Sequence, residues 1–146
     1  MMRMATVYRK DKHLYFHASS KTTYGVWIAA SPFSKVSVEA LIEEKGRAIE
    51  VALRGSAEGV DHPTDFRELM TPLLSLANVT SWSTFSRKAQ CCTVEMDDKS
   101  MVFIPHDNMG SREGFEPRID KALRLSAGAS RKEVGECLDR TLETCT

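Results

Sequence analysis

Residues 37–55 read SVEALIEEKGRAIEVALRG, and this stretch decides the fold predicted for the chain. Its apolar side chains recur at the three- and four-residue spacing of a helix with one buried stripe, namely Val38, Leu41, Ile42, Ile49, Ala52 and Leu53. Ser37 is suited to cap the N-terminus of this helix, and Gly55 is suited to a left-handed cap at its C-terminus. The stripe needs an apolar surface to cover, so we expect the rest of the chain to supply a sheet.

The residues before this helix favour β-structure. Tyr, Val and Phe are frequent in Ala5–Arg9 and His13–Ala18, which form a predicted hairpin around a charged break. A third strand is expected near Tyr24–Ala30. Ser31-Pro32 is expected to end that strand, because proline lacks the amide that pairs with a neighbouring strand.

The residues after the helix favour short helices and a second hairpin. The hairpin is predicted from Gln90–Met96 and Ser100–Pro105, which are joined by the polar turn 97–99. We expect residues 81–89 to be extended and helices to start at Thr64 or Asp65, at Thr71, at Pro117 (to Ala127) and after the capping-box residue Ser130. This order predicts one α+β domain over residues 1–146, with a mainly antiparallel sheet covered by helices.

Composition argues against several classes of protein. The chain has 146 residues, and its 20 basic side chains balance 20 acidic ones, which is unlike a general nucleic-acid binder. The middle third, residues 57–116, is the acidic part, with ten Asp or Glu against five Lys or Arg. No signal peptide or membrane-spanning run is recognisable, and the four cysteines do not form a disulfide pattern. These features predict a reduced, cytoplasmic protein.

Histidines and cysteines are the candidate metal ligands and nucleophiles of this chain. His13 and His17 share one face of a predicted strand, but zinc needs three or four ligands, so a solvated sheet face is the favoured interpretation. Cys91 and Cys92 must point to opposite sides of a strand, one into the core and one half-exposed. Neither has a neighbour that would stabilise a thiolate.

One loop, His62-Pro63-Thr64-Asp65, places a base and an acid close together. A helix cap at Thr64 or Asp65, with His62 packed beside it, explains the same residues. Phosphate-loop, dinucleotide-binding and nucleophile-elbow motifs are absent. The sequence therefore predicts no catalytic residue, no metal site and no cofactor.

The middle of the chain resembles a known family. The segments GVDHPTDF at 59–66, PLL at 72–74 and SW at 81–82, with Phe85, are similar to immunity proteins of bacterial contact-dependent growth inhibition systems, the CdiI type. Pro105 and the residues Asn108, Gly110 and Gly114-Phe115 fit the same resemblance. It implies a small cytoplasmic protein of a Gram-negative bacterium that binds and neutralises the C-terminal toxin domain of a CdiA effector, without contacting nucleic acid or membrane itself.

The distribution of acidic residues predicts where such a toxin would bind. These toxins are often nucleases, whose surfaces are basic, and an acidic inhibitor surface speeds and selects the encounter. The predicted contacts are the acidic residues around the late hairpin and the loop after it: Glu95, Asp97, Asp98, Asp107, Glu113 and Glu116. Two other functions stay open, a small nuclease or other hydrolase using His62 or His106, and a structural subunit of a bacterial complex.

Overall fold

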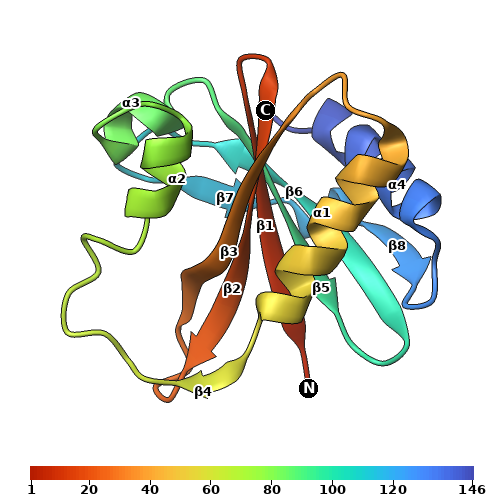
Figure 1. Cartoon of the computed structure of the whole chain (residues 1–146), viewed down its shortest axis with the longest axis horizontal. Coiled ribbons are helices and arrows are strands. Elements are labelled where there is room, and N and C mark those ends of the chain that lie inside the picture. The colour runs from red at the N-terminus through yellow and green to blue at the C-terminus, as the bar shows by residue number, and fades with distance from the viewer.

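Eight strands form a mainly antiparallel sheet with helices on both faces, in a computed structural model that describes residues 1–146 (Figure 1). The strands are β1 (Arg3–Lys10), β2 (His13–Thr22), β3 (Trp27–Ser37), β4 (Glu58–Val60), β5 (Gln90–Met96), β6 (Ser100–Asn108), β7 (Phe115–Pro117) and β8 (Leu123–Ser126). The helices are α1 (Ile42–Gly55), α2 (Thr71–Leu76), α3 (Trp82–Ser86), α4 (Arg131–Glu143) and the short 3₁₀ helix η1 (Ile119–Lys121). The predicted α+β class is confirmed.

Both predicted hairpins are present and lie next to each other at the centre of the sheet. The strands follow the order β3-β2-β1-β5-β6-β7, while β4 pairs in parallel with β2 and β8 pairs with β6. Val7 of β1 lies opposite Phe16 of β2 on one side and opposite Cys92 of β5 on the other. Because side chains alternate along each strand, this register builds two distinct apolar faces.

Helices α1 and α4 cover the first of these faces (Figure 1). A core of sixteen buried residues joins them to the sheet; it includes Ile49 from α1, Leu138 from α4 and Phe16 from β2. One side of α4, with Cys145 just after its end, is buried against the sheet: Val134, Cys137, Leu138, Thr141, Leu142 and Cys145. The predicted capping box of α4 is confirmed, with Ser130 Oγ accepting from the Glu133 amide at 3.1 Å.

Two glycines allow α1 and α4 to touch backbone to backbone. A Cβ added to Gly46 of α1 would lie 2.0 Å from the carbonyl oxygen of Arg131. A Cβ added to Gly135 of α4 would lie 2.1 Å from the carbonyl oxygen of Ile42. Lys45, the residue before Gly46, is buried, and its Nζ pairs with Asp139 of α4 at 3.0 Å. The helix pair is therefore set by small residues together with one partly buried ion pair.

Helix α1 begins later than predicted. Ser37 is the last residue of β3 rather than the helix cap, and Leu41 is the N-cap residue with 67 % of its surface exposed. At the other end, the cap residue Ser56 is extended rather than left-handed. Gly55 is required for a different reason, because a Cβ there would lie 2.4 Å from Pro32 Cδ.

Strand β3 does not end at Ser31-Pro32, so that prediction was wrong. His17 of β2 pairs with Phe33 and the next residue, Ala18, pairs with Ala30, so the ladder skips the two residues between them. The strand tolerates this proline because β3 lies at the edge of the sheet, where an amide donor is needed on one side only.

Helices α2 and α3 cover part of the second face. Their cluster is aromatic: the Phe85 ring meets the rings of Tyr8 and Tyr15 edge to face, with centroids 5.5 and 5.3 Å away. The predicted helix at Thr71-Pro72 is confirmed as α2. The extended assignment of 81–89 was wrong, because Ser81 caps α3 by accepting from the Thr84 amide at 3.1 Å.

Two further predicted helices are absent. Residues 61–70 form bends and turns, in which Asp65 binds the backbone and the guanidinium of Arg67 instead of capping a helix. Residues 117–127 contain the end of β7, the short η1 and strand β8. Leu123 and Leu125 of β8 lie opposite Phe103 and Met101 of β6, so a strand alternation overrides the helical spacing.

Candidate functional site

Three of the six predicted contact residues lie at the β5–β6 turn. Asp97 Oδ1 accepts from the amides of Lys99 and Ser100 at 2.8 and 2.9 Å, and these bonds hold the pKa of Asp97 below its ordinary value. Asp98 is exposed beside it and makes no ion pair, whereas Glu95 on β5 is half-buried. Asp97 therefore shapes the turn, and Asp98 is its free charge.

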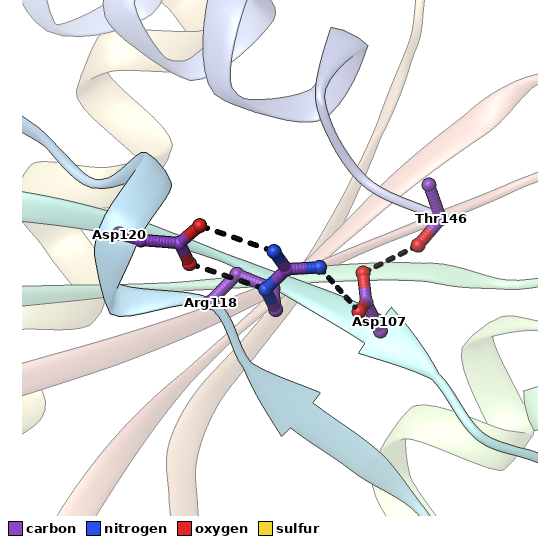
Figure 2. A network of polar contacts seen from close by, with 4 residues as sticks. All are labelled: Asp107, Arg118, Asp120 and Thr146. Carbon is purple, nitrogen blue, oxygen red and sulfur yellow. Dashed lines mark hydrogen bonds and ion pairs between the residues drawn. The ribbon is translucent and has the colours of Figure 1, made fainter.

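The other three lie near the far end of β6. Figure 2 shows Arg118 between two carboxylates, with its Nη1 2.9 Å from Asp107 and its Nη2 3.1 Å from Asp120. The Thr146 hydroxyl donates to the same Asp107 carboxylate, and these two partners hold the pKa of Asp107 low. The negative charge of Asp107 is thus balanced by a partner within the chain. Glu113 and Glu116 are exposed in the following loop and on β7.

The structure does not bring the six acidic residues together into one patch. Ser100 and Asp107 stand at the two ends of β6, seven residues apart, or about 24 Å along an extended strand. The hairpin-turn group and the β6–β7 group are therefore separate charged surfaces. A single partner must be wide enough to reach both.

The largest of the four main clefts lies beside the second group and is basic. Its volume is about 700 Å³, and it opens where the β1–β2 tip, the end of α3, the start of β5, the end of β6 and the last residue meet. In Figure 1 the hairpin tip, α3 and the C-terminus lie at the same end of the molecule. The lining is almost entirely polar: Arg9, Asp11, Ser83, Ser86, Arg87, Lys88, Ala89, Gln90, Asn108, Gly110, Ser111 and Thr146.

Sequence reasoning missed this cleft. Its cations, Arg9, Arg87 and Lys88, come from two segments almost eighty residues apart, within a chain whose total charge is zero. Only the Arg87-Lys88 pair inside the acidic middle third was a local signal. The pairing of β1 with β5, which places Arg9 opposite Gln90, is what joins the two segments.

The histidines proposed for hydrolysis stand apart from the main clefts. His62 Nδ1 lies 3.0 Å from Thr22 Oγ1, and its ring contacts that of Tyr24 at a tilt of 30°, with centroids 4.6 Å apart. His106 Nε2 lies 3.2 Å from Thr93 Oγ1, and burial lowers its pKa. Neither ring lines any of the four main clefts. Asp65, the predicted acid partner of His62, pairs with Arg67.

His17 and the adjacent cysteines differ from their predicted environments. His17 is 3 % exposed, between the rings of Tyr8 and Phe33, so its sheet face is not solvated. Cys91 and Cys92 do point to opposite faces, but both are buried, and burial raises both thiol pKa values well above the ordinary value. All four cysteines are free thiols. No three His, Cys, Asp or Glu side chains converge as metal ligands would.

None of the helices has the length and hydrophobicity needed to span a lipid bilayer. No family model matches the sequence, and no curated protein sequence is similar to it.

The fold matches solved structures over its whole length. One is a protein of unknown function from Neisseria meningitidis, 13% identical, with a TM-score of 0.83 over 100% of this chain and 96% of that chain. Another is a chain of the CdiA-CT/CdiI toxin and immunity complex from Yersinia pseudotuberculosis, also 13% identical, with a TM-score of 0.83 over 100% of this chain and 98% of that chain. At this identity the likeness shows a shared fold.

Proposed function

We propose that this chain is an immunity protein that binds and neutralises the C-terminal toxin domain of a CdiA contact-dependent growth inhibition effector. In this proposal the toxin is a nuclease, neutralisation is by binding rather than catalysis, and the protein acts in the cytoplasm. The toxin surface is basic where it holds nucleic acid, so it meets the acidic surfaces of the immunity protein.

The single observation that carries the proposal is the match of fold, over essentially the full length of both chains, with a chain of a toxin and immunity complex. That complex holds two proteins. The sequence resemblance at residues 59–66 and 72–74 favours the immunity side. The placement of His62 and His106 away from the main clefts supports binding over hydrolysis.

The acidic contacts belong to this proposal. At the β5–β6 turn, Asp98 is the residue whose charge is free to meet a partner, with Glu95 and Asp97 beside it. On the second surface, Glu113 and Glu116 are free, while Asp107 is committed to Arg118. Exposed charges at the rim of an interface act mainly on the rate of association.

The test is a set of binding kinetics against the toxin domain encoded immediately upstream, at several salt concentrations. Asp98→Lys should slow association and weaken its dependence on salt, because it removes long-range attraction to a basic partner. Glu136→Lys is the control of equal charge change, because Glu136 is exposed on α4, makes no ion pair and belongs to neither acidic group. Wild-type protein that fails to bind would overturn the proposed function, and an unchanged association rate in Asp98→Lys would remove the hairpin turn from the interface.

A further inference from the structure

We propose that the basic cleft at the β1–β2 tip binds a short carboxylate-bearing segment of the toxin. This inference rests on the proposed function and adds a second, oppositely charged contact to it. The acidic surfaces meet basic parts of the partner, and the cleft receives an acidic part.

The charge of the cleft is available to a ligand. Arg9, Arg87 and Lys88 all line it, all three are exposed, and none takes part in any of the ion pairs of the structure. The one acidic side chain in the lining is Asp11. Guanidinium groups in such a setting bind carboxylates through two parallel hydrogen bonds. The lining hydroxyls and amides of Ser83, Gln90 and Ser111 can supply further hydrogen bonds.

The wall that carries two of the cations is held in place by the rest of the fold. Asn108 Nδ2 donates to the carbonyls of Ser86 and Ala89 at 2.8 and 2.9 Å. Lys10 Nζ donates to the carbonyl of Arg87 at 2.6 Å. Lys88 has a φ of 59°, a left-handed conformation that is uncommon for a lysine. A fixed backbone lowers the entropy cost of binding a ligand here.

The surroundings favour a short acidic peptide over nucleic acid. No aromatic side chain lines the cleft, so nucleotide bases would have no ring on which to stack. Carboxylates border it, with Asp11 in the lining and Asp107 bonded to Thr146 of the wall, so the positive surface does not extend along a polyanion. A volume of about 700 Å³ is in the range of sites that enclose one ligand of a few side chains.

The first experiment compares two variants with the same change in net charge, using the upstream toxin and titration calorimetry. Arg9→Glu with Arg87→Glu reverses two cations of the cleft. Arg47→Glu with Lys132→Glu reverses two exposed cations on α1 and α4, outside the cleft and without ion pairs. The cleft variant should bind at least about tenfold more weakly than wild type, as expected for loss of close charge pairs, and the control less than about threefold. Unfolding in urea checks that both variants fold.

The second experiment titrates the wild-type protein, labelled for NMR, with hexaglutamate peptide and with a six-nucleotide RNA. Hexaglutamate should shift the amide signals of Lys88, Gly110 and Ser111, and the RNA should not. Wild type that binds toxin, with equal affinity in the cleft variant, would overturn the cleft assignment and leave the proposed function standing. Tighter binding of the RNA at the cleft would also overturn it. Wild type that binds no toxin would overturn the proposed function, and this inference with it.

Discussion

At the scale of single residues, two glycines decide how closely α1 and α4 approach. Neither was singled out by pattern, because a glycine inside a helix ordinarily weakens it. Here Gly46 and Gly135 each leave room for a carbonyl oxygen of the opposite helix, as a Cβ would lie 2.0 or 2.1 Å away from it. The lower helix propensity of glycine is offset by the apolar core that α1 and α4 share when they pack this closely.

Gly135→Ala should therefore destabilise the protein by at least about 1–3 kcal/mol, the cost of overpacking a tight contact. Chemical denaturation in urea measures it. Gly128→Ala is the matched control, since a Cβ at Gly128 meets only Ser126 Oγ at 3.8 Å, and its effect should stay within about 0.5 kcal/mol. Equal stability of Gly135→Ala and wild type would show that the two helices are not in backbone contact.

A second residue-scale prediction concerns His17. Its Nδ1 lies 2.7 Å from the Ala18 carbonyl, its Nε2 is buried without a partner, and burial lowers its pKa. The unfolded chain, with an ordinary histidine pKa of about 6.5, then takes up a proton that the folded chain does not. Stability from this residue is fully present above about pH 6.5 and is lost as the pH falls towards the lowered pKa of the folded state.

Urea unfolding of wild type and His17→Phe between pH 7.5 and pH 5.5 tests this. Stability of wild type should decline as the pH falls, and the decline should be smaller in His17→Phe. Burial lowers the pKa of His106 as well. His17→Phe should therefore still lose some stability as the pH falls, but less than wild type. Parallel curves for the two proteins would contradict the buried, unpartnered state of His17.

At the scale of elements, a helix or hairpin was predicted correctly where two independent local signals agreed. The β5–β6 hairpin and α4 combine an apolar period with a turn or a capping box, and both are confirmed. The prediction of Ser37 as a helix cap was wrong, because a serine at the end of an edge strand fits the same local pattern. The prediction of a helix over residues 117–127 was wrong for a similar reason. Ile119 fits a helical stripe but is 71 % exposed. Leu123 and Leu125 form a strand instead, because they pair with β6. Pairing partners of that kind lie outside any local window.

The corrected start of α1 gives a prediction at this scale. Ile49 is fully buried in the main core, and Ile49→Ala should cost about 2–5 kcal/mol, the usual range for such a truncation. Leu41 is 67 % exposed before the helix, so Leu41→Ala should cost less than about 0.5 kcal/mol. Urea denaturation of both variants decides between this start and a helix that begins at Ser37, for which the two costs would be alike.

At the scale of the whole molecule, charge is arranged in ways that a count of residues hides. The net charge is zero, but the charged side chains are not evenly spread. One end of β6 carries an acidic turn, and at its other end carboxylates border a basic cleft. The acidic residues could be selected from the sequence, because they follow one another along the chain. Their separation into two groups and the assembly of the cleft depend on the pairing of β1 with β5 and on the extension of β6 to Asn108.

The central claim is that this chain neutralises a CdiA toxin domain by binding it. The most direct measurement is growth of cells that express the toxin domain encoded immediately upstream, with and without this protein. We predict that wild type and His62→Ala/His106→Ala restore growth alike, because the proposed neutralisation is by binding and uses neither histidine, and that both form a stable complex with the toxin. Cells that stop growing despite soluble, folded wild-type protein, with no complex recovered, would contradict the account.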